Sequence, residues 1–331
     1  MSILKKIRTS LLYVFFLGVA TLFLLELSYR FYIIDFYRGN LTGLNPIELL
    51  EKTDQSTILI IGDSFTADPD SYVAHLRKKL SNHRVINAAI PGTCVKQHSL
   101  FFKKRIQEFK PDILIYQIYV GNDLLEFRHP LKSPNISWAR KIYWWLSDRI
   151  IVLTYINAKL PVLRQAIYHD LPIKTDPKAL ETFSMEGYSA RSKLQFRAEP
   201  NLLEHTISLQ GERKQDMFKF TKTVNQILQQ APSDCEVYVL VMPHCIQINE
   251  RYISRLQSIG ATISRHSDNL IIEYPFIKYL KQHLDSTIHL INPLEHLKKQ
   301  ELVAPVYYGN DPHLNSYGQK VVGDVIMDSW Q

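Results

Sequence analysis

Short apolar runs alternate with segments of helical periodicity along most of this chain, and that alternation limits the folds open to it. A sheet residue alternates between two faces, so a nearly continuous apolar run indicates a strand buried on both. Five such strands are predicted, at Ile58–Ile61, Val85–Ala89, Ile113–Val120, Glu236–Met242 and Thr287–Ile291. Helices are predicted at Ser71–Leu80, Val95–Phe109, Arg213–Gln230, Glu250–Ile259, Tyr274–Leu284 and around Leu314–Ile326. This pattern predicts an α/β fold with a five-stranded parallel sheet and helices on both faces.

The alternation stops between about Leu124 and Gln210, which we interpret as an insert after the third strand. Residues near helical spacing form an apolar aromatic stripe with basic flanks, made of Trp138, Ile142, Trp145, Leu146, Arg149 and Leu153. The stripe favours a helical cap packed on the sheet. A lid over the site, or a helix resting on a membrane surface, is the alternative.

The amino terminus has the features of a membrane anchor. Lys5, Lys6 and Arg8 precede the uncharged apolar run Leu11–Leu25, which is at the short end for a span of about 20 residues. No small-x-small cleavage site follows, which favours an uncleaved anchor over a cleaved signal peptide. The basic flank predicts a cytoplasmic amino terminus and an extracytoplasmic catalytic part, periplasmic or at the cell surface. We predict an anchor over residues 1–30, a juxtamembrane tether over 31–55, and a catalytic domain over 56–331 with its insert at about 124–210.

The charge, the cysteine spacing and the missing motifs limit which partners and cofactors the sequence predicts. The net charge is +7, but the basic residues are spread along the chain, so no nucleic-acid groove is predicted. A mild basic excess suits a protein beside anionic lipid or glycan. Cys94, Cys235 and Cys245 lack the spacing of a zinc ribbon or a disulfide framework. Without a P-loop, a dinucleotide-binding motif or a zincin motif, we expect no cofactor and no metal.

Four polar turns follow predicted strands or lie near the same edge of the sheet. They are Gly62-Asp-Ser64, Gly92-Thr93, Gly121-Asn-Asp123 and Asp311-Pro-His313. Ligands of open α/β sheets bind outside the carboxyl ends of the strands. A serine becomes a nucleophile when an imidazole takes its proton and a carboxylate orients that imidazole. Taken alone, Gly-Asp-Ser is equally well a simple turn; the other three turns favour chemistry.

This ordered set resembles the SGNH (GDSL) hydrolase superfamily. The resemblance covers about Ile58 to Ile326 except the insert, and implies a three-layer α/β/α sandwich with a five-stranded parallel sheet, SGNH/flavodoxin-like. The roles that it implies are Ser64 as nucleophile, His313 as general base, Asp311 as orienting acid, and Gly92 and Asn122, with the Ser64 amide, as oxyanion hole. Members are mostly esterases, lipases, carbohydrate deacetylases and thioesterases, with some acyltransferases.

Two positions depart from the family pattern. Gly121 and Asn122 are adjacent, whereas the family usually has a residue between them. The family acid usually stands three residues before the histidine, where this chain has Asn310. Asp311 stands two before His313, and residues two apart in an extended segment point the same way, so Asp311 is the predicted acid.

The sequence therefore predicts a membrane-anchored serine esterase acting on an acylated envelope glycan or lipid, with the bilayer and that substrate as partners. The alternatives are an O-acyltransferase that modifies an envelope polysaccharide and a non-catalytic scaffold with the same fold. Substrate specificity is expected within the insert. Asp63 and Asp123 are expected to bond turn amides, and His98 is read as an ordinary helix residue. His244 and Cys245 either line the cleft or belong to a structural loop.

Overall fold

The computed structural model describes residues 3–167, 182–264 and 274–330. The chain divides into two compact units, each taken here by itself. One joins Met1–Phe36 to Ile142–Pro172, and the other joins Tyr37–Lys141 to Ile173–Gln331. The first unit thus contains part of the predicted insert together with the predicted anchor. The domain boundaries proposed from the sequence stay a prediction.

The larger unit is built on one parallel sheet. Its strands are β1 (Thr57–Ile61), β2 (Arg84–Asn87), β3 (Ile113–Tyr119), β4 (Glu236–Met242) and β5 (His289–Ile291). Their order is β2-β1-β3-β4-β5, and every neighbouring pair is parallel. The predicted α/β fold with five parallel strands is confirmed.

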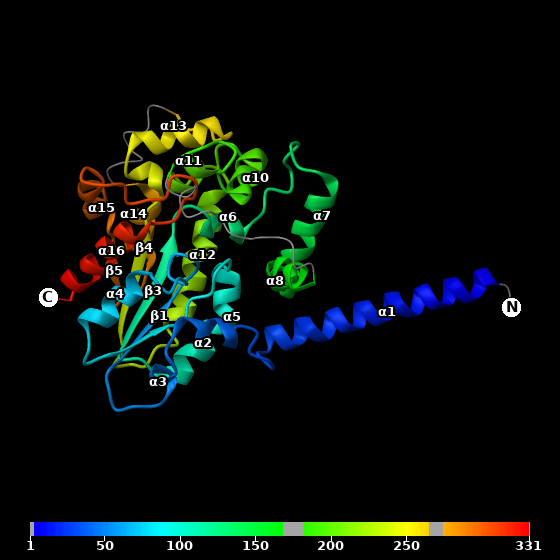
Figure 1. Ribbon diagram of the computed structural model, residues 1–331, viewed down its shortest axis with the longest axis horizontal. Helices are drawn as coiled ribbons and strands as arrows, with labels where there is room; N and C mark the ends of the chain where they lie inside the picture. The colour runs from blue at the N-terminus through cyan, green and yellow to red at the C-terminus, as the bar shows by residue number, and fades with distance from the viewer. Residues whose placement is uncertain (1–2, 168–181, 265–273, 331) are drawn as a thin grey trace. The chain divides into compact units, whose positions relative to one another are not determined.

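Helices cover both faces of the sheet (Figure 1). On one face α4 (Tyr72–Lys79) packs against α16 (Ser316–Asp328), and α15 (Leu294–Glu301) packs beside α16. On the other face α5 (Val95–Phe109) packs against α12 (Arg213–Leu228). Further helices described in this unit include α6 (Asp123–Phe127), α10 (Ala190–Ala198), α11 (Leu202–Ile207), η1 (Cys245–Gln247), α13 (Glu250–Ser258) and α14 (Pro275–His283).

Helices on both faces of the sheet explain why its strands are apolar throughout. A contact with the central strand β3 also fixes the turn that follows β1. All five residues of β1 are buried, as expected for a strand with helices on both sides. Directly after it, a Cβ on Gly62 would lie 2.5 Å from Oε1 of Gln117 on β3, closer than atoms pack. Oε1 of Gln117 also accepts hydrogen bonds from the Asp63 amide at 3.0 Å and from the Thr66 hydroxyl at 3.2 Å. The Gln117 side chain therefore holds the Gly62-Asp63-Ser64 turn against β3, the central strand of the sheet.

The predicted tether contains two short helices, α2 (Arg38–Leu44) and α3 (Ile47–Leu50). Between them the buried side chain of Asn45 donates to the Asn87 carbonyl at 2.8 Å and accepts from the Asn87 amide at 2.8 Å. Asn87 ends β2, the edge strand, so Asn45 satisfies backbone groups that an edge otherwise leaves open.

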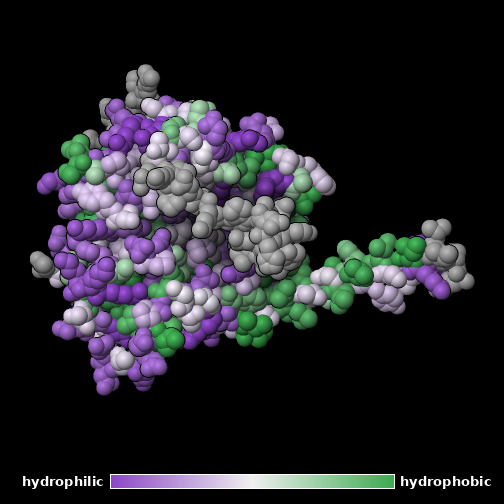
Figure 2. Space-filling model, in the orientation of Figure 1, coloured by the Kyte–Doolittle hydropathy of each residue, from purple (hydrophilic) through white to green (hydrophobic). Residues whose placement is uncertain are grey.

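In the smaller unit, α1 (Ile3–Arg30) is the element long and apolar enough to cross a membrane among the helices the structure describes. Its apolar stretch, Lys5–Arg30, has exposed side chains along most of its length, and Figure 2 shows many of them in the colour of hydrophobic residues. By length and composition this helix fits an anchor or a signal peptide.

The last turn of α1 is packed within that unit, against the start of α8 (Val152–Ile167). The Glu26 carboxylate accepts hydrogen bonds from the Ile151 and Val152 amides at 3.0 and 2.8 Å. These amides open a helix and have no carbonyl partner within it, so an acidic side chain stabilises them. Tyr29, three residues further on, is fully buried, with its ring 5.3 Å from that of Phe36.

The aromatic stripe is only partly buried, and its packing on the sheet as a cap stays a prediction. Trp138 and Trp145 are 77% and 47% exposed, whereas Trp144, outside the stripe, is buried. Four residues separate the end of α7 (Trp138–Ser147) from the start of α8 (Val152–Ile167). The helical spacing that joined Trp138 to Leu153 was therefore read across a break between two helices.

Candidate active site

The turn after β1 holds a half-buried serine in a fixed position. The Asp63 carboxylate accepts a hydrogen bond from the Phe65 amide at 2.9 Å, as predicted for a turn aspartate. The Asp63 carbonyl accepts from the Thr66 amide at 3.2 Å and the Ala67 amide at 2.9 Å. Burial raises the pKa of Asp63. With both neighbours fixed, Ser64 is presented at the carboxyl end of the strand.

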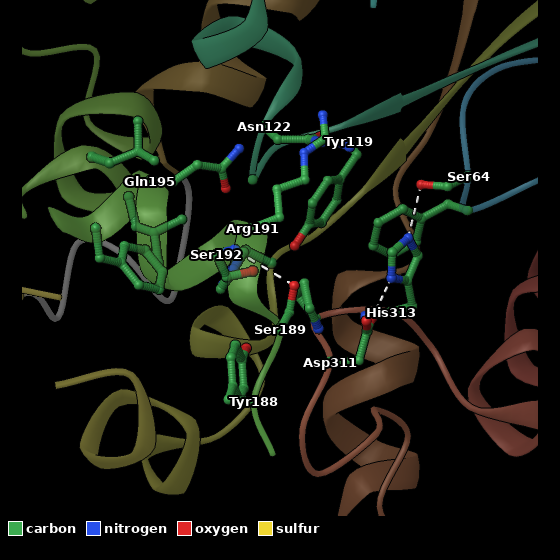
Figure 3. A pocket seen from close by; sticks show the side chains of 17 residues that line it. Ser64, Tyr119, Asn122, Tyr188, Ser189, Arg191, Ser192, Gln195, Asp311 and His313 are labelled. Atoms are coloured by element: carbon green, nitrogen blue, oxygen red, sulfur yellow. Dashed lines mark hydrogen bonds and ion pairs between the residues drawn. The ribbon is translucent and has the colours of Figure 1, made fainter. Parts of the chain in front are cut away.

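The structure brings together the three residues predicted as nucleophile, base and acid (Figure 3). The Ser64 hydroxyl lies 2.8 Å from Nε2 of His313. The Asp311 carboxylate contacts Nδ1 of His313 and accepts from the His313 amide at 2.9 Å. A carboxylate at Nδ1 fixes the tautomer in which Nε2 accepts the serine proton.

The same contacts shift the pKa values of the histidine and the acid. Burial lowers the pKa of His313, but the hydrogen bond and charge of Asp311 outweigh it and raise the pKa above its usual value. Burial raises the pKa of Asp311, but the hydrogen bond and charge of His313 hold it below its usual value. Asp311 is therefore a carboxylate at neutral pH and stabilises a protonated His313.

Asn310 forms hydrogen bonds with the segment that precedes α10. Its side-chain Oδ1 accepts from the Ser184 amide at 2.6 Å, its amide group donates to the Thr182 carbonyl, and its own carbonyl accepts from the Ser189 amide at 3.1 Å. These three bonds attach the segment before α10 to the loop that carries Asp311 and His313.

The loop containing Gly92 is shaped by a buried hydrogen-bonded chain. Gly92 has φ +71°, which disfavours any residue with a Cβ. The Thr93 hydroxyl donates to the Ile90 carbonyl at 2.6 Å, so it accepts from Nε2 of His98 at 2.9 Å. Nδ1 of His98 is then the acceptor for the Tyr116 hydroxyl at 2.8 Å.

His98 is consequently not the ordinary helix residue expected. It is fully buried, and burial lowers its pKa to about 3, so it stays neutral. Its position ties α5 and the Gly92 loop to β3. Helical periodicity gave no sign of this, because the two partners lie on a loop and on a strand.

Asn122 follows β3 and faces the same pocket as Ser64. The next residue, Asp123, accepts from the Tyr119 amide at 2.9 Å, again as predicted for a turn aspartate. A Cβ on Gly121 would lie 2.4 Å from the Tyr119 ring, which explains a glycine at that point. Gly92 is not among the described residues that line the pocket.

The pocket beside Ser64 has a volume of about 70 Å³ and three kinds of wall. The predicted site supplies Ser64, Asn122, Asp311 and His313, and buried aromatic rings, among them Phe65 and Tyr119, supply a second wall. His244 also lines the pocket. Its Nδ1 accepts a hydrogen bond from the Ile246 amide at 3.3 Å within the loop after β4. His244 therefore both lines the cleft and stabilises a loop, the two alternatives expected from the sequence.

The third wall comes from the insert. Its polar members are Tyr188, Ser189, Arg191, Ser192 and Gln195, and its apolar members are Phe196, Leu202 and Leu203. The sequence placed specificity somewhere in the insert but singled out none of these residues. A serine before a helical segment, at Ser189, is the local signal that was available, since Ser189 caps α10.

Metal-ligating side chains do not cluster in the described parts of the chain: no group of three or more His, Cys, Asp or Glu residues there is placed to hold an ion. The expectation that the reaction needs no metal or cofactor stays a prediction.

No family model matches this chain, and no curated protein matches it in sequence. Solved structures match over most of their length. An alpha/beta hydrolase from the metagenome of Lake Arreo, Spain, is 15% identical with a TM-score of 0.40, over 85% of this chain and 97% of that one. TesA is 13% identical (TM-score 0.41; 83% and 98%), as is an acetylxylan esterase from Geobacillus stearothermophilus (0.41; 84% and 95%). At these values the likenesses carry no conclusion about activity.

Proposed function

We propose that this protein is a serine ester hydrolase that removes a short acyl group from an envelope glycan or lipid, working beside the membrane in which its amino-terminal helix is anchored. One observation carries the proposal: the unbroken series of contacts from the Ser64 hydroxyl, through His313, to the Asp311 carboxylate. A serine that only formed a turn would have no need of an imidazole 2.8 Å from its hydroxyl.

The reaction follows from these contacts. Ser64 Oγ attacks the acyl carbon while its proton passes to Nε2 of His313, and Asp311 stabilises the imidazolium. The carbonyl oxygen becomes an oxyanion beside the Ser64 amide, with Gly92 and Asn122 as the other proposed donors. The ester C–O bond then breaks, and the leaving alcohol takes the proton from His313. Water, activated by the same imidazole, releases the acid from Ser64.

The size and the lining of the pocket suit an ester of a small acyl group and a polar alcohol. A volume of about 70 Å³ is far below the roughly 300–1,000 Å³ of pockets that enclose drug-sized ligands. The insert wall offers hydroxyl and amide groups from Tyr188, Ser189 and Gln195, which suit the hydroxyls of a sugar. An acyl group such as acetyl on a carbohydrate fits both features.

The packing of the last turn of α1 supports an anchor that is retained. Glu26 bonds the start of α8 and Tyr29 is buried in the same unit. Cleavage beyond Tyr29 would remove both groups from a packed structure. A retained anchor with basic residues before it puts the catalytic unit outside the cytoplasm, next to envelope lipids and glycans.

Substitution of the nucleophile and the base tests the proposal. Ser64→Ala and His313→Ala should each lower kcat for p-nitrophenyl acetate by about 10³-fold or more, because removing either member disables the proton transfer. Ser99→Ala, at an exposed helix position, is the matched control and should retain wild-type turnover. A fluorophosphonate probe should label the wild type and the control but not Ser64→Ala. Full turnover by Ser64→Ala would sink the proposal.

A further inference from the structure

Arg191, from the insert, lines the pocket beside Ser64. We propose that its guanidinium is a further catalytic group, which donates to the oxyanion beside Gly92 and Asn122 and carries the full positive charge that those neutral donors lack. This inference rests on the proposed ester hydrolysis and adds a residue, and a role for the insert, that the motifs do not contain.

Geometry gives the first support. Arg191 lines the pocket that also contains Ser64, Asn122 and His313. One terminal nitrogen of its guanidinium lies 3.9 Å from the point that a Cβ on Gly92 would occupy. Figure 3 shows the Arg191 side chain directed into the pocket on the side of Asn122. The cation thus lies near Gly92 and shares a pocket with Asn122.

The start of α10 is attached to the catalytic loop, which fixes where Arg191 stands. The Ser189 amide donates to the Asn310 carbonyl at 3.1 Å, and Asn310 is the residue directly before Asp311. The Ser189 side chain caps α10 at the Ser192 amide. Arg191 is therefore positioned by the same loop that carries the acid and the base, as a preorganised catalytic group requires.

The electrostatics agree with this placement. Besides the larger effects of burial and of Asp311 on His313, the charge of Arg191 lowers the pKa of His313. It also lowers the pKa of Asp63, against burial, which raises it. Asp63 directly precedes the reacting serine and His313 contacts its hydroxyl, so the charge of Arg191 acts on groups on both partners of the proposed proton transfer.

The reaction needs a positive charge beside the carbonyl oxygen when the oxyanion forms. When Ser64 Oγ bonds to the acyl carbon, the carbonyl π pair moves to the oxygen and leaves a full negative charge there. The serine proton has gone to His313. A guanidinium N–H aimed at this oxygen gains most in the transition state and little with the neutral ester. Collapse returns the pair to the carbonyl and expels the alcohol, which is protonated by His313.

Arg191→Ala tests the inference with an uncharged ester, p-nitrophenyl acetate. Removing an oxyanion donor should lower kcat by about 10²-fold with KM within about twofold. Guanidinium chloride, at concentrations too low to unfold the protein, should restore part of kcat by entering the vacated space. Arg197→Ala is the matched control: it lies on the same helix, is exposed, and is not among the lining residues.

The outcomes separate this inference from the proposed function. If Arg191→Ala retains wild-type kcat while Ser64→Ala is inactive, the esterase stands and the role of Arg191 is overturned. An increase in KM for anionic esters alone would also overturn it, since that pattern indicates recognition of a charged substrate group. A wild type that neither hydrolyses esters nor reacts with a fluorophosphonate would overturn both. A loss of kcat accompanied by guanidinium rescue supports the inference, because a merely misfolded variant would not be rescued.

Discussion

At the scale of single residues, Asp311 decides how the site responds to pH. His313 must be neutral to take the serine proton, and Asp311 raises its pKa. The wild-type kcat/KM should therefore rise with pH through a value above the usual His pKa of about 6.5. Asp311→Asn should move this rise to lower pH, because the stabilising charge is gone, and lower kcat by about 10³-fold because the tautomer is no longer fixed.

Profiles of kcat/KM against pH for both proteins check this prediction. Asp324→Asn is a matched control, because Asp324 also pairs with a histidine, His75, at 2.7 Å on the outside of the sheet layers. An unchanged profile in Asp311→Asn would assign the acid to another residue.

The same pair sets a pH window for stability. The raised pKa of His313 means that its stabilisation is complete below its unfolded value of about 6.5 and is lost as pH rises through the folded value. The lowered pKa of Asp311 means that its stabilisation is complete above about 3.9 and is lost as pH falls through the folded value. The difference in unfolding free energy between wild type and Asp311→Asn should therefore be largest between about pH 4 and 6.5. Urea titrations across pH measure it, and a difference that does not vary with pH would contradict it.

Gly62 gives a second residue-scale prediction. A Cβ at this position would meet Gln117 at 2.5 Å. Gly62→Ala should therefore cost about 1–3 kcal/mol of unfolding free energy and disturb the serine turn. Gly43→Ala is the control, because Gly43 is helical and has nothing within 4 Å of an added Cβ; it should be stabilising by about 0.5–1 kcal/mol. Denaturant titration separates the two, and equal effects would contradict the steric argument.

At the scale of elements, segments with a continuous apolar run or one consistent face were predicted from their patterns, and several helices of the tether and the insert, among them α8, were not. The limits of α5 and β4 agree with the expected Val95–Phe109 and Glu236–Met242, because each has a consistent face or is apolar throughout. The short helices α2, α3 and α15 were missed, since helices of that length depend on tertiary packing rather than on local propensity. The stripe from Trp138 to Leu153 extends over two helices, α7 and α8, so its helical spacing continues across a break.

Glu26 provides the prediction that belongs to this scale. Glu26→Gln removes the charge at the first amides of α8 and should weaken the local structure by about 0.5–2 kcal/mol. Hydrogen exchange at the Ile151 and Val152 amides should become faster by the corresponding factor. Glu48→Gln, an exposed first-turn residue of α3, is the control and should leave these amides unchanged. Unaltered exchange in Glu26→Gln would contradict the proposed cap.

At the scale of the whole molecule, the retained anchor is the property to test. A tag placed at Met1 should remain on the mature protein and stay in the membrane fraction after an alkaline carbonate wash. A protease added outside intact spheroplasts should digest the catalytic unit but leave the tag, as the basic amino-terminal flank predicts. Release of an untagged, soluble protein would show a cleaved signal peptide instead.

What the sequence determined by itself is the fold class and the residues proposed as nucleophile and base. Strand burial leaves continuous apolar runs, and the ends of parallel strands meet at one edge, so Ser64 and His313 were expected together across 249 positions. Tertiary structure decided which of Asn310 and Asp311 faces the histidine, and that His98 is a buried connector. It also decided that Arg191 stands beside Gly92. The positions of these side chains depend on how the insert and the loops pack. Contacts between segments distant in sequence determine that packing, and such contacts leave no local pattern in the sequence.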